Sequence, residues 1–161
     1  MAQTADLDAL FSRLKTANAE EAKDIEAEIW IEWSKSGSDA MDLLLERGRK
    51  AMAAGDAALA VAHLTALVDH APDFAEGWNA RATAYYQLGE FGPSVADIAK
   101  TLTLNPRHFG ALSGLGSIFE SLGAPDKALE AYKAAQAVNP FATGVDEAID
   151  RLTTDAQGQE L

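Results

Sequence analysis

A repeat of 34 residues runs through most of this 161-residue chain. Small residues, glycines and prolines all recur at that spacing. The matching positions are Gly48, Ala82 and Gly116; Gly55, Gly89 and Gly123; and Pro72, Pro106 and Pro140. Self-similarity at a period of about 20 to 50 residues is typical of proteins in which one small structural unit is stacked several times. The repeat therefore constrains the fold more than any other feature of the sequence.

Each repeated unit is predicted to be two helices. Leu44, Gly48 and Ala51 are spaced by four and three residues, which places them on one face of a helix. Gly55 then ends this helix, because glycine adopts the left-handed backbone at little cost. A second apolar stripe follows and stops at Pro72, since the residue before a proline is disfavoured in the α conformation. The sequence thus predicts an all-α array of antiparallel helix pairs, which must stack to bury their apolar faces.

Unit 75–108 resembles the tetratricopeptide repeat (TPR) family. The matches to the family pattern are Trp78, Ala82, Tyr85 and Pro106, and the departures are Arg81 and Ser94, where the family often has Leu and Ala. The resemblance covers residues 41–142 and implies a right-handed superhelical solenoid. Among bacterial proteins, a chain of this size and design resembles a small assembly or adaptor factor. We expect Trp78, Tyr85 and Leu88 to form the core stripe of one helix.

The repeat divides the chain into six segments. The predicted boundaries are 5–36 for a degenerate N-terminal helix pair, 41–74, 75–108 and 109–142 for three TPR units, 143–153 for a C-terminal capping helix, and 154–161 for a flexible tail. Residues 5–36 are assigned as a degenerate unit because bulky Leu14 replaces the small residue of the later units. The capping helix carries Val145 and Leu152 on one face, which would cover the last unit.

Composition excludes several classes of protein. The chain has 13 Lys and Arg against 25 Asp and Glu, a formal charge of -12, which repels nucleic acid and anionic membranes. No apolar run approaches the roughly 18 residues of a membrane-spanning helix, so a soluble protein is expected. The lack of cysteine excludes disulfides and thiolate metal sites. If Ala2 and Gln3 follow a signal-peptidase cut, the periplasm is slightly favoured; otherwise the cytoplasm is expected.

No catalytic, cofactor or metal motif is present in the sequence. His63 and His70 lie seven residues apart on one predicted helix, and a metal-dependent protein or enzyme using them is the alternative to a binding module. His108 is predicted to lie on the surface of a turn. An acidic column of Asp8, Asp42 and Glu76 is explained by the helix dipole, with a functional acidic ladder as the alternative.

The TPR resemblance implies a concave groove, lined by the first helix of each pair, that binds an extended peptide or a helix of a partner protein. The candidate groove residues are Lys15, Leu45, Arg49, Met52, Asn79, Thr83, Tyr86, Gln87, Gly110, Ser113, Gly114, Ser117 and Glu120. Some TPR proteins clamp the C-terminal carboxylate of a chaperone with several cationic and amide side chains. At the corresponding positions this chain keeps one cation, Arg49, so a carboxylate clamp is not expected.

A bare strip is predicted on the first helix of unit 109–142. Gly110 and Gly114 share a face with Ser113 and Ser117, although a glycine inside a helix costs about 1 kcal/mol relative to alanine. We expect a partner helix, a bulky side chain or the chain's own C-terminal segment to press there, with tolerated drift as the alternative. The sequence as a whole predicts a non-catalytic module for protein binding. A self-associating structural protein is a further alternative.

Overall fold

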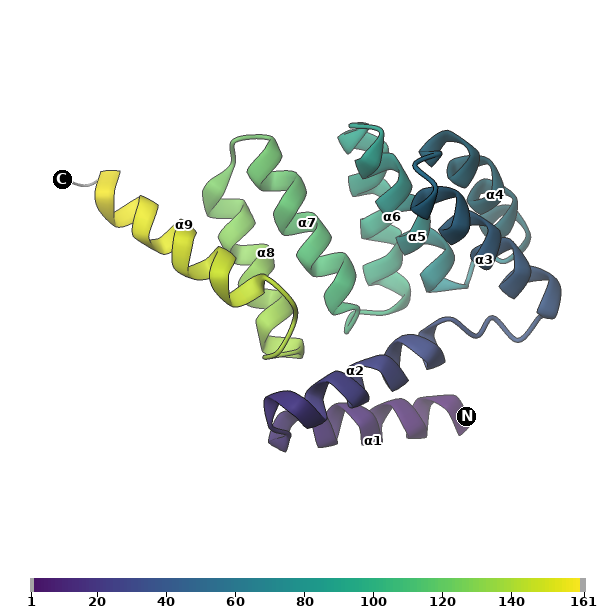
Figure 1. The fold of residues 1–161 in the computed structure, drawn as a ribbon, viewed down its shortest axis with the longest axis horizontal. Helices are drawn as coiled ribbons and strands as arrows, with labels where there is room; N and C mark the ends of the chain where they lie inside the picture. Colours follow the sequence, from purple (N-terminus) through teal and green to yellow (C-terminus); the bar gives the residue numbers. More distant parts are fainter. Residues whose placement is uncertain (1, 160–161) are drawn as a thin grey trace.

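The computed structural model describes residues 2–159, with the side chains of residues 6–158. Within this part of the chain there are nine helices and no strand (Figure 1). The helices are α1 (Ala2–Thr16), α2 (Ala19–Trp33), α3 (Asp39–Ala53), α4 (Ala57–His70), α5 (Ala75–Gln87), α6 (Phe91–Leu104), α7 (Phe109–Ser121), α8 (Pro125–Val138) and α9 (Val145–Gln159). None of the described helices has both the length and the apolar content needed to cross a bilayer.

Helices α3 to α8 form three antiparallel pairs that lie side by side (Figure 1). The small residues inside the pairs have a packing reason. A Cβ atom on Gly48 would lie 2.6 Å from Leu64 of the facing helix, and one on Gly116 would lie 2.6 Å from Tyr132. Because real Cβ atoms do not approach so closely, these positions exclude larger side chains. The predicted all-α solenoid of helix pairs is confirmed.

The glycines between the helices of each pair take the conformation that the repeat requires. Gly55, Gly89 and Gly123 have φ angles of 80°, 73° and 69°, in the left-handed region that favours glycine. Each follows the last residues of α3, α5 or α7 and turns the chain into the next helix. The three connections are therefore short and equivalent, which sets the regular spacing of the array.

Helix α9 closes the far end of the array by packing on α8. Val145 and Leu152 join Tyr132 and Ala135 in one apolar cluster, and all four side chains are buried. This helix is longer than the predicted capping helix at 143–153: it runs from Val145 to Gln159 and includes most of the segment 154–161 that was predicted to be a flexible tail.

The N-terminal pair α1 and α2 is not stacked on α3 as a further unit of the array. The pair runs across the ends of the array helices (Figure 1). Phe11 and Trp33 pack against Phe109 at the start of α7. At the edges of this contact Arg107 pairs with Asp8 at 2.8 Å, and Asn139 donates a hydrogen bond to Glu26 at 3.0 Å. The pair predicted at 5–36 thus packs on the third unit instead of the first.

The aromatic stripe predicted on α5 is only partly buried. Trp78 is half-buried, its Nε1 donates to the Pro72 carbonyl at 2.8 Å, and the guanidinium of Arg81 lies 5.1 Å from its ring centre. Leu88, the first residue after the end of α5, is 42% exposed. The core of this unit is made instead by smaller residues, such as Ala80 and Ala84, which are buried.

Candidate binding groove

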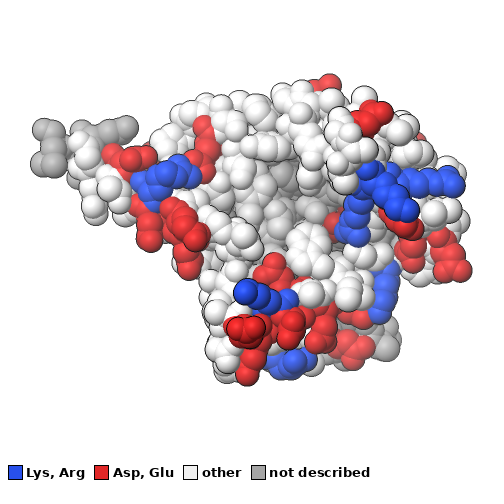
Figure 2. Space-filling view, in the orientation of Figure 1, with Lys and Arg blue, Asp and Glu red and all other residues white. Residues whose placement is uncertain are grey.

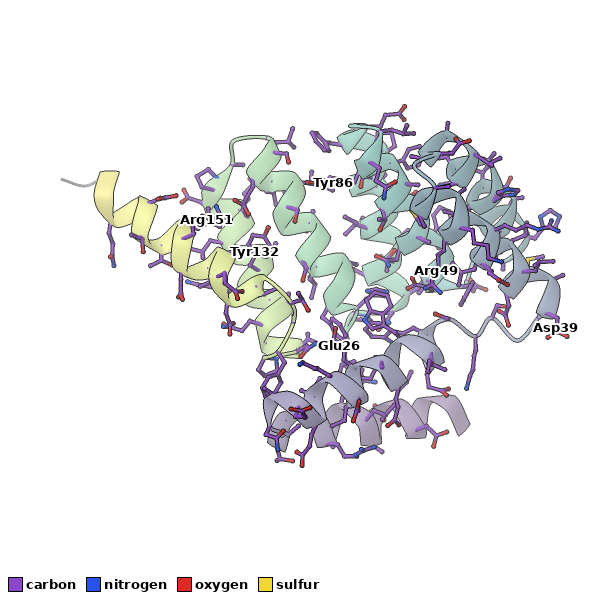
Figure 3. All side chains as sticks on the ribbon, viewed as in Figure 1. Glu26, Asp39, Arg49, Tyr86, Tyr132 and Arg151 are labelled. Carbon is purple, nitrogen blue, oxygen red and sulfur yellow. The ribbon has the colours of Figure 1, made fainter. Side chains whose placement is uncertain are left out.

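A cavity of about 120 Å³ opens between the second and third helix pairs. Its lining residues are Asn79, Ala82, Thr83 and Tyr86 from α5; Ser94 and Ile98 from α6; and Gly110, Ala111, Gly114, Ser117 and Ile118 from α7. In Figure 2 the middle of this face is hollowed and free of charged side chains, which gather around its edge. Figure 3 shows Tyr86 between α6 and α7 and Arg49 lower, toward α2. Six predicted groove residues therefore meet around one uncharged hollow.

The hollow exists because α7 presents glycine where a side chain would fill the space. A Cβ atom on Gly114 would contact only Ile98, at 3.8 Å, an ordinary van der Waals distance. The two helix pairs are thus held apart at this point without a side chain between them.

Three hydroxyl groups around the hollow, those of Thr83, Ser94 and Ser117, are bonded within the chain. Thr83 Oγ1 donates to the Asn79 carbonyl at 3.2 Å, Ser94 Oγ to the Ala82 carbonyl at 2.7 Å, and Ser117 Oγ to the Ser113 carbonyl at 3.3 Å. Since their protons are directed at helix carbonyls, these side chains turn largely apolar surface toward the cavity. The hollow is more apolar than its residue types suggest.

One end of the bare strip is covered by the chain itself. A Cβ atom on Gly110 would lie 2.7 Å from the indole ring of Trp30, which comes from α2. Of the three occupants expected from the sequence, a bulky side chain is the one found at Gly110, and it belongs to the N-terminal pair and not to the C-terminal segment. Gly114 and Ser117 remain uncovered on the cavity wall.

A buried polar cluster adjoins the hollow through Asn79 and is centred on Glu76, which is 2% exposed. Its carboxylate accepts hydrogen bonds from Arg49 at 2.9 Å and from Asn79 at 3.3 Å. It also contacts Nε2 of His108 at 2.7 Å, while the other ring nitrogen, Nδ1, accepts the N–H of Ala111 at 3.0 Å. Because Nδ1 is an acceptor, Nε2 must carry the ring hydrogen and donate it to Glu76.

The prediction that His108 lies on a turn surface is wrong. Its side chain is fully buried, because the ring of Trp33 stacks on it with centroids 4.3 Å apart. The residue also caps α7 through its bond to the Ala111 N–H. No local pattern reveals this role, because Trp33 reaches His108 only through the folding of α2 over the array.

The acidic column is used for contacts within the chain. Asp8 pairs with Arg107, Asp42 accepts from the backbone N–H of Ser36 at 2.8 Å, and Glu76 forms the cluster above. The one cation at the clamp positions is engaged too, since Arg49 donates to Glu76 and, at 3.0 Å, to Ser34. The side chains of the acidic column therefore hold different parts of the fold together.

The other candidate groove residues lie outside the cavity. Leu45 is 2% exposed and belongs to the apolar core of the first unit, with Met52 packed beside it. Lys15 and Gln87 are exposed. Ser113 Oγ donates to the Phe109 carbonyl at 2.9 Å.

Glu120, the last candidate, holds α9 against α7. Its carboxylate accepts from Arg151 at 2.6 Å and from Tyr132 at 2.8 Å. The hydrogen bond from Arg151, helped by the one from Tyr132, lowers the pKa of Glu120 despite partial burial. Burial raises the pKa of Tyr132, and its bond to Glu120 adds to that effect.

The histidines of the alternative metal site are not joined by a third ligand among the described residues. No group of three or more His, Cys, Asp or Glu side chains there could hold a metal ion. His70 instead hydrogen-bonds the Ala66 carbonyl through Nδ1 at 2.8 Å.

Comparison with known proteins supports the repeat assignment. The family model described as tetratricopeptide repeat matches residues 45–92 and 80–143. The chain belongs to the tetratricopeptide repeat family. A TPR repeat-containing protein of the bacterium Rhizobium etli is 35% identical over 153 residues, which cover 94% of this chain and 75% of that protein. The small glutamine-rich TPR-containing protein 2 of Saccharomyces cerevisiae is 32% identical over 76% of this chain, but this chain spans only 35% of that protein.

Solved TPR domains share the fold. The first TPR of Spaghetti (RPAP3), bound to the HSP90 peptide SRMEEVD, superposes with a TM-score of 0.70 at 22% identity and covers 74% of this chain and 95% of that chain. The Sgt2 TPR domain from Aspergillus fumigatus gives a TM-score of 0.71 at 21% identity, over 76% of this chain and 83% of that chain. At these identities the likeness concerns the fold alone.

Proposed function

We propose that this TPR protein is a non-catalytic adaptor that binds a peptide or helix of a partner protein in its concave groove. The observation that carries the proposal is the uncharged hollow between α5 and α7, which the array leaves unfilled. The solved domain bound to an HSP90 peptide supports it, because that domain has the same fold. The engaged Arg49 guanidinium argues against a cationic carboxylate clamp in this chain.

A pair of matched variants tests this function. Thr83 is exposed on α5 beside the hollow, and Thr83→Arg places a bulky cation there. Leu59 is 45% exposed on α4, away from the hollow, so Leu59→Arg makes a comparable change on the opposite side of the first unit. We expect proteins captured by the immobilised wild-type chain to be lost with Thr83→Arg and kept with Leu59→Arg. Equal capture by both variants would contradict binding in the groove.

Arg49→Glu is unsuitable as a groove variant. It would place a second carboxylate beside buried Glu76, and a buried charge without its partner is strongly destabilising. Loss of binding would then reflect loss of the fold.

Sedimentation of the wild-type chain at several concentrations tests the self-associating alternative, since a monomer sediments independently of concentration.

A further inference from the structure

We propose that the cavity between α5, α6 and α7 holds one branched aliphatic side chain of an extended partner segment, and that a backbone N–H of this segment donates to Asn79. The inference rests on the proposed function and specifies the chemistry of what enters the groove. It names an anchor, an acceptor and a backbone conformation for the ligand. Each follows from a separate feature of the cavity.

The size and surface of the cavity favour an aliphatic anchor. Its volume is about 120 Å³, close to the roughly 150 Å³ of an apolar cavity that binds benzene. Ile98, 3% exposed, forms part of its wall, and no ionisable carboxylate or amine lies among its lining residues. A charged side chain would lose its hydration there without gaining a counter-ion, which is unfavourable. An uncharged branched side chain fits without this cost.

Asn79 supplies a hydrogen-bond acceptor that the chain itself does not use. The side chain is 8% exposed and lines the cavity. Its Nδ2 donates to both oxygens of Glu76, at 3.3 and 3.4 Å, and because an ionised carboxylate only accepts, this contact fixes the orientation of the amide. Oδ1 accepts no hydrogen bond from any residue that the structure describes. A donor on the ligand would satisfy it.

The need for a donor favours an extended segment over a helix. Inside a helix each backbone N–H is already bonded to a carbonyl four residues earlier, so only an extended backbone offers free N–H groups along its length. The bare surface at Gly114 allows such a backbone to approach α7 closely. Trp30, seated on Gly110, closes the lower end of the strip, so the anchor side chain enters above it.

A small probe tests the cavity without knowledge of the partner. N-acetyl-L-leucine N-methylamide carries one branched side chain and two backbone N–H groups. We expect it to bind the full chain with a Kd of about 1 mM, as its dozen or so heavy atoms allow. Binding is measured by NMR as saturable shifts of the Ile98 δ1-methyl and Asn79 side-chain amide signals. The glycine analogue, which lacks the side chain, should not shift these signals.

A methylated probe tests the hydrogen bond. The same leucine compound with every N–H replaced by N–CH₃ keeps the side chain and loses the donors. We expect it to bind about 10-fold more weakly, the effect of one lost hydrogen bond. Equal affinity of the two probes would overturn the role of Asn79.

Variants at Gly114 test the site itself. Gly114→Leu fills the cavity with the chain's own side chain and should abolish the probe shifts, whereas Gly92→Leu, on the exposed first turn of α6, should keep them. The Cβ of Gly114→Ala meets only Ile98, at 3.8 Å, so this variant should fold without a clash. It should lower the affinity for the leucine probe less than Gly114→Leu does. No saturable shift with the wild-type chain, or the same shifts with Gly114→Leu, would overturn the proposal.

Partner capture separates failure of this inference from failure of the proposed function. Partners lost from both Thr83→Arg and Gly114→Leu support the cavity as the anchor site. If Thr83→Arg loses the partners while Gly114→Leu keeps them, the groove is retained as the binding surface and the anchor site is overturned. If both variants keep them, the proposed function fails as well.

Discussion

Arg81 departs from the family pattern and pairs with Asp97 between α5 and α6. Its Nε and Nη2 donate to the two carboxylate oxygens at 2.7 and 2.9 Å, and its Nη1 donates to Thr65 of α4. The two side chains are 14% and 6% exposed, and the hydrogen bond to Asp97 raises the pKa of Arg81. Two parallel hydrogen bonds of this kind are strong and directional. One side chain thus links three helices of neighbouring units.

Replacing Arg81 by the leucine usual in the family should therefore destabilise this chain. Arg81→Leu leaves the Asp97 carboxylate buried without a partner, at an expected cost of about 3–5 kcal/mol in the free energy of unfolding. Urea denaturation measures the loss. The double variant Arg81→Leu/Asp97→Leu removes both charges and should recover most of it. A single variant as stable as the wild-type chain would contradict this account.

At the scale of the helices, the N-terminal pair α1 and α2 is held against α7 by contacts that depend on Gly110. Trp30 of α2 lies on Gly110 and packs edge-on against Phe109, with ring centres 5.9 Å apart. Trp33 adds its stack on His108. Without the bare surface at Gly110 the indole of Trp30 could not reach α7. The docking of one element thus depends on a missing side chain in another.

Two alanine substitutions on α7 should have opposite effects. The Cβ of Gly110→Ala would fall 2.7 Å from the indole of Trp30, so this ring must move, its packing on α7 should weaken, and hydrogen exchange in α1 and α2 should become faster. Gly114→Ala meets only Ile98 at 3.8 Å and should raise the free energy of unfolding by up to about 1 kcal/mol through helix propensity. Equal protection of α1 and α2 in both variants would refute the docking role of Gly110.

The attachment of α9 should depend on pH. Arg151 lowers the pKa of Glu120 below its ordinary value of 4.5, so the pair stabilises the fold fully above that value and loses its effect as the pH falls through the lowered pKa. Glu120→Gln should therefore lower the Tm at pH 7, and the difference from the wild-type chain should shrink below about pH 4. Glu130→Gln, on the exposed side of α8, serves as the control. A difference that stays constant down to pH 2 would contradict this role.

At the scale of the whole molecule, the net negative charge destabilises the folded state, because exposed carboxylates repel one another. The chain carries a formal charge of -12, and its enclosed contacts, Arg81 with Asp97 and His108 with Glu76, are shielded from the solvent. Salt screens repulsion between exposed carboxylates much more than it weakens buried pairs. The net effect of salt should be stabilising.

We therefore expect the Tm to rise with sodium chloride. At about 1 M salt the screening length falls to about 3 Å, which removes most repulsion across the surface. Calorimetry or circular dichroism at neutral pH measures the change. A lower Tm in salt would mean that exposed pairs such as Lys50 with Glu46 outweigh the general repulsion.

Those residues of the candidate site whose position follows from the 34-residue repeat could be predicted from the sequence. The TPR resemblance implies that the first helix of each unit lines the concave side, so Asn79, Thr83 and Tyr86 could be assigned to the groove from that resemblance and their phase in the repeat. Phase does not report burial, however, and Leu45 proved to be a core residue. Nor does it report hydrogen bonds between units, which engage Arg49 and Glu120.

The sequence by itself determined the helix pairs, their turns and their stacking, because these depend on residues a few positions apart and are repeated every 34 residues. Only the tertiary structure decided where the N-terminal pair lies, why His108 is buried and how the hollow is closed at Gly110. These features depend on pairs as distant as Glu26 and Asn139, 113 residues apart, which occur once. A contact that occurs only once produces no repeating pattern in the sequence. It stabilises the fold only after the array has formed the surface on which α2 packs.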